Sequence, residues 1–291
     1  MNVNCPHCEF RSDYISDFRT VVRIGHFHRT SDSKDLQRYR CLLCKKTFSE
    51  ATKDPCFRQK KRQKNKMLSE LIASGVSERR SARLLRINRT TVARKIIFLG
   101  ARAAERLFIS NASLKVNHFQ FDDLETFEHS RHKPLSVTLA VTGQRHLLGL
   151  RVASMPAKGG HAKKAIQRYG PRHDGRSESR KQLFMELKPI VAPGALIQSD
   201  SNPHYVNDVK RFFPGCYHLP LKGQRGSRTG QGEIKAEGFD PLFALNHTCA
   251  MIRENICNLV RKTWCTTKKR ERLADRLAIY ALYHNQHLKS A

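Results

Sequence analysis

Two Cys-x-x-Cys pairs near the start of the chain constrain its fold more than any other feature of the sequence. The first pair is Cys5 and Cys8, and the second is Cys41 and Cys44. A two-residue spacer lets one tight turn direct two thiolates at one ion, so two such turns complete a tetrahedral all-sulfur zinc site. The separation of the pairs exceeds the commonest finger spacing. It predicts a zinc ribbon with an enlarged hairpin over residues 1–55.

The zinc ion of this module is expected to be structural. The segment is short and polar, so metal binding should supply most of its folding free energy. His7, His26 and His28 are alternative ligands, but four thiolates already satisfy zinc. The other cysteines lie among apolar or basic neighbours and are interpreted as ordinary or buried thiols. They are Cys56, Cys216, Cys249, Cys257 and Cys265.

The charge of the chain predicts a polyanionic partner. Its 291 residues include 54 Lys+Arg and 25 Asp+Glu, a formal net charge of +29, and the basic residues recur along the whole length. Such a field favours nucleic acid over a membrane surface. No apolar run approaches the ~20 residues of a membrane span, and the N-terminus lacks an apolar signal core. We therefore expect a cytoplasmic, nucleoid-associated protein that binds double-stranded DNA.

Residues 56–112 are predicted to hold a basic linker and a helix-turn-helix. The stretch 58–66 contains nothing apolar, which fits a solvated helix face, phosphate contacts, or both. Apolar residues within 67–72 form the face of a first helix, and Ser77 can cap a second one. A turn at Ile87-Asn88 precedes the third helix.

The third helix is the expected DNA reader. Val92 and Ile96 would anchor it to the other two helices, so its remaining side chains would face the major groove. These are Arg89, Thr90, Thr91, Arg94 and Lys95. An ordinary three-helix bundle with a basic outer face is the alternative. The helix-turn-helix is favoured because the short turn, the capped helix and the basic face coincide.

The remainder, residues 113–291, reads as an α/β domain built on a mixed sheet. Three strands come first, and strands then alternate with helices, an order that fits adjacent first and fourth strands. The expected strands lie at 116–128, 134–141, 146–152, up to Asp200 and at 217–219. The expected helices lie at 181–190, 203–213, from Asp240 onwards and at 271–287.

Two aspartates stand out in this domain. Asp122 lies within the run 118–127 and Asp200 within 195–202, each at or just after an apolar stretch. A strand delivers a carboxylate to the end of a sheet in this way. If the two strand ends are adjacent, the pair can chelate a divalent metal such as Mg²⁺ or Mn²⁺. Glu125, close to Asp122, is an auxiliary candidate.

Two basic stretches containing glycines interrupt the domain. Residues 156–180 are expected to form a flexible surface loop, with plain disorder as the alternative. Residues 222–232 are interpreted as a cationic loop that grips DNA or, equally, as a solvated connector.

The order of these parts resembles the transposase of the bacterial insertion-sequence-one family. Each match is short, but together they follow one order over nearly the whole chain. They are Cys5-Pro-His-Cys8, Tyr39-Arg40-Cys41 through Cys44, Lys46-Thr47-Phe48, Gly75-Val76 with Arg79, Ala82 and Arg83, and Arg261 to Lys268.

This resemblance implies a DDE-type recombinase with a multidomain α+β fold: a zinc ribbon, a helix-turn-helix and a ribonuclease-H-like catalytic domain. Such an enzyme cuts and joins DNA at the ends of its element with two divalent ions, Mg²⁺ or Mn²⁺, as an oligomer on DNA. The family's two aspartates correspond to Asp122 and Asp200. Its catalytic Glu falls on Asn246.

The departure at Asn246 leaves three readings open. The amide oxygen of Asn can bind a hard cation but adds no charge, so the site can work with two aspartates and an amide. Alternatively a nearby acid takes the part, or the protein is catalytically inactive. The candidate acids are Asp240, Glu237 and Glu254.

The long helix that carries Asn246 is expected to start at Asp240-Pro241, by the usual N-cap and first-turn preferences. Asn246 and Arg253 lie two turns apart on one side, so Asn246 can lean over the metal while Arg253 approaches a phosphate. The apolar face of this helix comprises Leu242, Leu245, Cys249, Ile252, Ile256 and Leu259.

Two rival classes remain at this stage. One is a DNA-binding regulatory protein that keeps the ribbon and the helix-turn-helix but has lost catalysis. The other is an RNA-binding zinc-ribbon protein of the translation apparatus, which leaves residues 116–260 unexplained.

Overall fold

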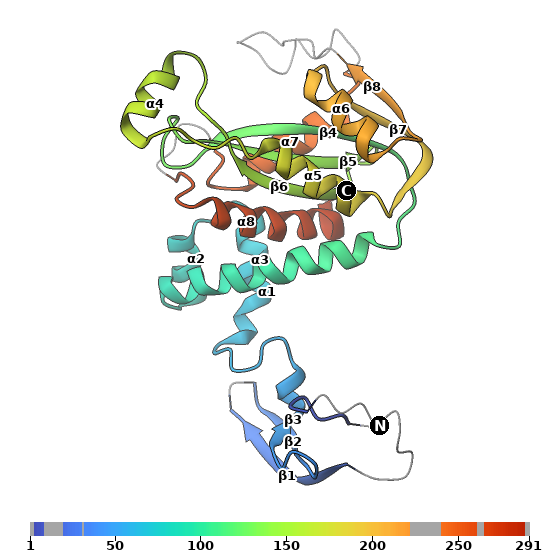
Figure 1. The fold of residues 1–291 in the computed structure, drawn as a ribbon. Coiled ribbons are helices and arrows are strands. Elements are labelled where there is room, and N and C mark those ends of the chain that lie inside the picture. The colour runs from blue at the N-terminus through green and yellow to red at the C-terminus, as the bar shows by residue number, and fades with distance from the viewer. Residues whose placement is uncertain (1–2, 9–19, 31, 222–239, 261–264, 289–291) are drawn as a thin grey trace. The chain divides into compact units, whose positions relative to one another are not determined.

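The computed structural model describes residues 3–8, 20–30, 32–221, 240–260 and 265–288. The chain divides into two compact units, Met1–Lys66 and Met67–Ala291 (Figure 1). The predicted helix-turn-helix and the predicted catalytic segment therefore belong to the same unit. Each unit is taken by itself below.

The first unit is built on a three-stranded antiparallel sheet. Its strands are β1 (Val21–Arg29), β2 (Lys34–Cys41) and β3 (Thr47–Ser49), in the order β1-β2-β3. The β1–β2 hairpin occupies the space between the two cysteine pairs, as the long spacing predicted. The apolar core is small: Tyr39 stacks on Phe48 with ring centroids 5.4 Å apart, beside the buried Cys41.

The basic linker is partly tied to this unit. Arg62, within the short 3-10 turn Arg62–Lys64, donates a hydrogen bond of 2.8 Å to Asp54 and also pairs with Asp32 at the hairpin. The side chain of Arg62 is only 12% exposed. This arginine has a structural partner, whereas the sequence alone suggested a solvated or DNA-contacting run.

Three helices open the second unit: α1 (Asn65–Ala73), α2 (Glu78–Leu85) and α3 (Arg89–Asn111). The Ser77 hydroxyl accepts the N–H of Arg80, which confirms the predicted cap, and Asn88 caps α3 in the same way. Val92 and Ile96 are buried as expected. The third helix is longer than predicted: it continues through Gly100 to Asn111, and its later turns pack on α8 (Arg270–Tyr283).

A five-stranded mixed sheet forms the centre of this unit, in the order β6-β5-β4-β7-β8. The strands β4 and β7 are parallel neighbours, so the predicted adjacency of the first and fourth strands is confirmed. Only β5 runs against the other strands. The strands are β4 (Val116–Phe127), β5 (Pro134–Thr142), β6 (Leu147–Ser154), β7 (Val191–Asp200) and β8 (Tyr217–Leu221).

Residues 156–180 contain more structure than the sequence suggested. A helix, α4 (Ala162–Tyr169), forms there, and α5 (Arg176–Leu187) starts several residues before the predicted position. The expectation of one flexible loop is therefore wrong for this part. The glycines at 159–160 and 170 lie on either side of α4 and do not disrupt it, since residues 161–169 between them include no Gly or Pro.

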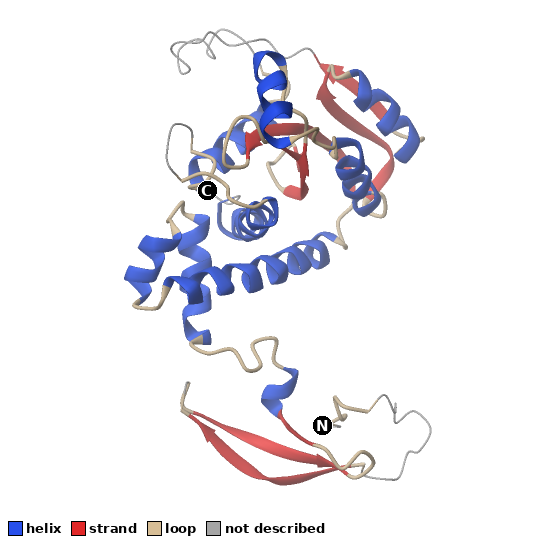
Figure 2. Ribbon diagram, turned by 60° about the vertical axis from the view of Figure 1, so that its left-hand side comes forward, coloured by secondary structure: helices blue, strands red, loops and turns tan. Residues whose placement is uncertain are grey.

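Helices cover both faces of the sheet (Figures 1 and 2). On one face α5 and α6 (Pro203–Phe212) pack their apolar residues on Phe119, Phe121 and Ile197. On the other, α7 (Phe243–Asn255), α8 (Arg270–Tyr283) and α3 share a core with residues of β4, β5 and β6, including Leu124 and Leu139. The result is a three-layer arrangement with one sheet in the middle.

The helix α7 starts later than the sequence predicted. Asp240 and Pro241 lie before it, and the first helical residue is Phe243. The Asp240 carboxylate instead accepts the N–H of Leu242 at 3.0 Å and the side-chain amide of Asn246 at 2.9 Å. A π-helical turn, His284–Leu288, extends α8.

Candidate functional site

The four cysteines of the two Cys-x-x-Cys pairs converge in the first unit. Their sulfur atoms all lie within 4.8 Å of one another, and the Cys5–Cys44 and Cys8–Cys41 distances are each 3.6 Å. A tetrahedral zinc with bonds of about 2.3 Å to sulfur requires sulfur–sulfur distances of about 3.8 Å. The donor set and its spacing therefore fit a metal ion such as zinc.

Cys41 is the buried member of this cluster. Burial alone would raise the pKa of its thiol, but backbone N–H groups of Cys44 and Leu43 outweigh that effect and lower the pKa to about 7. A thiol that loses its proton near neutral pH is ready to ligate a cation. Of the alternative ligands, His28 is engaged with Asp35 at 2.8 Å.

Asp122 and Asp200 are brought together by the parallel pairing of β4 and β7. Phe121 lies opposite Ser199 in this ladder, and the two aspartates are the next residue on each strand. Residues in that relation lie about one strand spacing apart, ~4.8 Å, and point to the same face of the sheet. Asp200 ends β7, as predicted, while β4 continues past Asp122 to Phe127.

The surroundings of Asp122 are unusual for a carboxylate. Burial, followed by the negative charge of Asp200, raises the pKa of Asp122 from 3.8 to about 7. The hydroxyl of Tyr205 donates a hydrogen bond of 3.1 Å to its Oδ1. A buried carboxyl whose pKa is raised by a neighbouring acid is the kind of group that a nearby cation stabilises in its charged form.

Tyr205, on the first turn of α6, was not anticipated from the sequence. Its side chain is 1% exposed. Burial and the charges of Asp123 and Asp122 raise the pKa of Tyr205, so its hydroxyl keeps the proton that it donates. The only sequence signal was its place three residues after Asn202, the cap of a helix that begins beside Asp200.

Arg180 of α5 lies behind Tyr205 and is also almost fully buried. Its guanidinium lies 5.1 Å from the centre of the Tyr205 ring. It donates hydrogen bonds of 2.7 Å to Asp208 and 3.4 Å to Asp123. This cation offsets the negative charge gathered around Asp122, and it too was missed, because it lies in a stretch predicted to be a loop.

Gln120 holds helix α7 against β4, the strand that carries Asp122. The Gln120 side chain accepts the N–H of Leu245 at 3.0 Å and donates to the carbonyl oxygen of Pro241 at 2.9 Å. Gln120 precedes Asp122 by two residues, so both lie on the same face of β4. One turn after Leu245, burial and then the charge of Asp122 raise the pKa of the Cys249 thiol to about 12. Cys249 is therefore an α7 side chain close enough to Asp122 for the charge of that carboxylate to affect the pKa of its thiol.

Asn246, the position that corresponds to the family's Glu, is exposed. Its amide nitrogen donates to Asp240, so the two side chains pair with each other. Of the alternative acids, Glu254 influences Tyr280 of α8, and Glu237 lies outside the described residues. Among the residues that the structure describes, the four cysteines form the one group of three or more His, Cys, Asp or Glu side chains close enough to share an ion.

A cleft of about 520 Å³ opens between the end of β4 and the end of α7. Arg253, predicted to approach a phosphate, lines it together with Arg131 and Phe127. Glu125, the auxiliary candidate for a metal ligand, also borders the cleft. Its carboxylate forms an ion pair with Lys158 at 2.8 Å. The cleft therefore brings two arginine side chains together at the end of β4, the strand that carries Asp122.

The α3 residues predicted to face outward differ in their exposure. Arg89, Thr90 and Arg94 are exposed and Thr91 is half-buried. Lys95 is 3% exposed, so its assignment to the outer face is wrong. The spacing explains this, because Lys95 follows Val92 by three residues and therefore shares its inward side of the helix.

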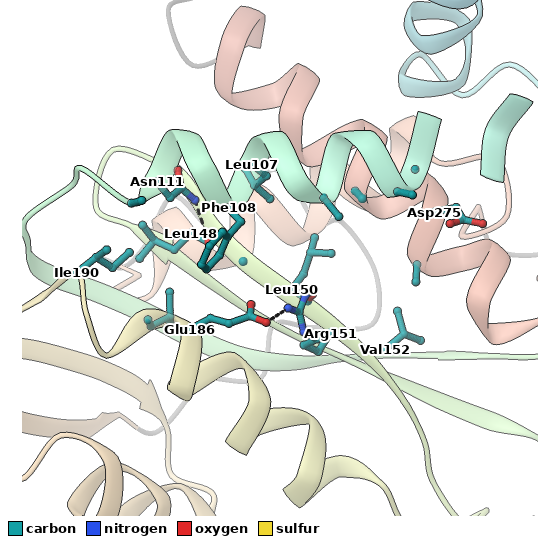
Figure 3. A pocket seen from close by; sticks show the side chains of 18 of the residues that line it. Leu107, Phe108, Asn111, Leu148, Leu150, Arg151, Val152, Glu186, Ile190 and Asp275 are labelled. Atoms are coloured by element: carbon teal, nitrogen blue, oxygen red, sulfur yellow. Dashed lines mark hydrogen bonds and ion pairs between the residues drawn. The ribbon is translucent and has the colours of Figure 1, made fainter. Parts of the chain in front are cut away.

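A second cavity, of about 340 Å³, lies between α3, β6 and α5 (Figure 3). Leu107, Leu148 and Ile190 make much of its wall apolar, and an ion pair between Arg151 and Glu186 borders it. Its lining includes none of the predicted site residues.

Two predicted DNA-contacting elements fall outside the described residues. These are the loop 222–232 and the first part of the run 261–268. In the part of the chain that the structure covers, no helix combines the length and apolar character needed to cross a bilayer.

No protein-family model matches this chain. No curated protein matches it either.

Proposed function

We propose that this chain is a transposase that uses divalent metal ions to cut DNA strands and join them to a target. The observation that carries the proposal is the placement of Asp122 and Asp200 on neighbouring parallel strands, with the pKa of Asp122 raised by burial and by Asp200. A divalent cation would relieve that repulsion. Hard carboxylate oxygens are the donors that Mg²⁺ and Mn²⁺ prefer.

The arrangement of the sheet supports a ribonuclease-H-like domain. The first three strands are consecutive neighbours, the fourth pairs in parallel with the first, and the fifth lies outside the fourth. In open sheets of this kind, ligands bind at the carboxyl ends of the parallel strands, where the strand order reverses. Asp200 ends β7 at that edge.

The chain's own residues would have distinct roles in the reaction. Asp122 and Asp200 would hold the cations, with the Asn246 amide as the third position carried over from the resemblance. When bound, the two ions supply Lewis-acid activation of the attacking oxygen and neutralise charge on the leaving oxygen. Arg131 and Arg253 would contact phosphates flanking the reacting one.

Two displacements at phosphorus follow from this assignment. In the first, a water oxygen attacks a phosphodiester, the bond to the 3′-oxygen breaks, and a 3′-hydroxyl and a 5′-phosphate result. In the second, that 3′-hydroxyl attacks a phosphodiester of the target and releases a target 3′-hydroxyl. No oxidant or energy donor is needed, because the first step is a hydrolysis and in the second step one phosphodiester replaces another.

The remaining parts of the chain would deliver the DNA. We assign the exposed Arg89, Thr90 and Arg94 to the major groove, and the net charge of +29 to non-specific attraction of the duplex. The four-cysteine module would bind zinc as a structural ion. Element ends and target are the DNA partners proposed, with a homo-oligomer assembled on them.

A DNA-binding regulatory protein without catalysis is the second candidate. It is favoured by the state of Asn246, which is exposed and pairs with Asp240. Among the described residues, Asp122 and Asp200 also do not belong to a group of three or more potential ligands close enough to share an ion. This candidate keeps the DNA affinity and predicts no metal-dependent chemistry.

The two candidates differ in one assay. Duplexes containing the sequences that flank the coding region are incubated with the purified protein and MgCl₂ or MnCl₂, and cleaved and joined strands are resolved on denaturing gels. The transposase predicts metal-dependent nicks that expose 3′-hydroxyls, abolished by Asp122→Asn and by Asp200→Asn. Glu105→Gln, on the exposed face of α3, is the matched control and should behave like the parent protein.

Binding of the same duplexes by all variants, without any nick in either metal, would establish the regulatory protein instead. Gene context gives an independent check, because inverted repeats on both sides of the coding region are expected only for a mobile element.

A further inference from the structure

The segment that joins β7 to α6 contacts both aspartates of the proposed metal site. At its start, Asp200 Oδ1 accepts the backbone N–H of Asn202 at 3.0 Å. One turn later, the hydroxyl of Tyr205 donates to Asp122 Oδ1 at 3.1 Å. Residues 202–205 therefore contact one oxygen of each carboxylate.

The position of Tyr205 is fixed on several sides. Its ring packs against Phe121, with centroids 4.9 Å apart, and under the guanidinium of Arg180 at 5.1 Å. Arg180 is itself held by hydrogen bonds to Asp208 of α6 and Asp123 of β4. The tyrosine thus has little freedom to point its hydroxyl anywhere but at Asp122.

We propose that Tyr205 is a positioning residue, which orients the Asp122 carboxylate so that its Oδ2 and that of Asp200 face one divalent cation. Arg180 serves this arrangement indirectly, because it holds the ring and balances the acids around it. The inference rests on the proposed function, since it assigns a role toward the metal of that site. The inference extends the proposed function by adding Tyr205 and Arg180, two residues that lie on helices and not on the strands that carry the aspartates.

A purely structural role would have a different signature. Buried tyrosines commonly donate to a nearby acceptor to satisfy the hydroxyl. In that case its removal would lower stability and leave cation affinity unchanged. An orienting hydrogen bond to a ligand has its main effect on metal affinity, and such outer partners typically change it 10- to 100-fold, an order-of-magnitude range.

The test is a titration of the full chain with Mn²⁺ in the absence of DNA. The concentration of free Mn²⁺ is measured at each point by electron paramagnetic resonance. Tyr205→Phe keeps the ring and its packing while removing the hydroxyl. We expect an apparent Kd for Mn²⁺ roughly tenfold higher than that of the parent protein, with a Tm changed by only a few degrees. Tyr217→Phe is the matched control, because Tyr217 lies on β8 and is 72% exposed.

Asp122→Asn separates this inference from the proposed function. If the parent protein binds Mn²⁺, Asp122→Asn abolishes binding and Tyr205→Phe weakens it, the positioning role is supported. If Asp122→Asn abolishes binding but Tyr205→Phe matches the parent protein, the positioning role is overturned while the metal site stands. If Asp122→Asn leaves binding unchanged, the metal site itself is refuted, and the role of Tyr205 with it.

Discussion

Arg276 of α8 donates a hydrogen bond of 2.8 Å to Glu78, the first residue of α2. The guanidinium is buried, whereas the carboxylate is about a third exposed. Glu78 also lies 3.9 Å from Arg89, the first residue of the predicted reading helix. The helix α2 is thus joined by an ion pair to α8, which packs against the sheet.

Glu78→Ala should destabilise the second unit by about 2 to 4 kcal/mol, because it leaves a buried guanidinium without its carboxylate partner. Urea denaturation, monitored by circular dichroism, measures the decrease in the free energy of unfolding. Glu105→Ala, which removes one side of an exposed pair with Arg102 on α3, should cost less than about 1 kcal/mol. Equal effects of the two substitutions would show that Arg276 does not depend on Glu78.

Gly100 lies where α3 and α8 come into close contact. A Cβ at this position would lie 2.5 Å from Asp275 Cβ and 2.6 Å from its Cα, too close for a backbone to absorb cheaply. Gly→Ala within a helix normally stabilises by about 1 kcal/mol, but here overpacking should reverse the sign and destabilise by about 1 to 3 kcal/mol. Thermal unfolding measures it, with Gly215→Ala as control, since nothing lies within 4 Å of a Cβ there.

These contacts mark what local sequence could and could not predict. Short runs rich in apolar residues located the strands, and Ser77 located a helix start, because strand propensity and helix capping depend mainly on residues close in the chain. The length of α3 depends on α8, which is more than 150 residues away in the chain. Arg180 and Tyr205 were missed for the same reason, since their partners lie on other elements.

The errors at the site have the same origin. Lys95 was placed outside because it is charged, whereas helical spacing puts it beside Val92. Asn246 was placed over the metal by correspondence, whereas its side chain pairs with Asp240 and Cys249 is the α7 residue whose thiol senses Asp122. By contrast, the proximity of Asp122 and Asp200 follows from the predicted adjacency of the first and fourth strands, which the structure confirms.

Asp122 should make stability depend on pH. Burial and Asp200 raise its pKa from 3.8 to about 7, so between these values the unfolded chain loses this proton while the folded chain keeps it. The free energy of unfolding therefore falls as pH rises from about 4 to 7 and stays lowered above 7. Asp122→Asn removes this penalty, and we expect it to be more stable than the parent protein at pH 8 by roughly 2 to 4 kcal/mol.

Urea unfolding at pH 4, 6 and 8, without added divalent cations, checks this expectation. The difference between Asp122→Asn and the parent protein should shrink toward zero at pH 4. Asp35→Asn removes a carboxylate that is 74% exposed and should give a nearly parallel profile. A constant difference at all three pH values would exclude a raised pKa for Asp122.

The cysteine cluster predicts selective unfolding of the first unit. Metal analysis should find one zinc per chain, and Cys41→Ser should lose it, because the buried sulfur of a four-thiolate set is removed. Hydrogen exchange should then show loss of protection in β2 and unchanged protection in β4. Cys56→Ser, outside the cluster, should keep its zinc, and loss of zinc there would contradict the assigned ligand set.

The neighbours Arg94 and Lys95 provide a paired test of the DNA-binding face, because one is exposed and the other buried on the same turn of α3. Each phosphate contact releases a counterion, so losing one should reduce the slope of log K against log salt by about 1. Arg94→Ala should therefore weaken duplex binding and flatten this slope. Lys95→Met should leave the slope unchanged, since a buried ammonium cannot contact a phosphate. Fluorescence anisotropy of a labelled duplex across a salt series measures both, and a flatter slope for Lys95→Met would mean that this lysine faces DNA.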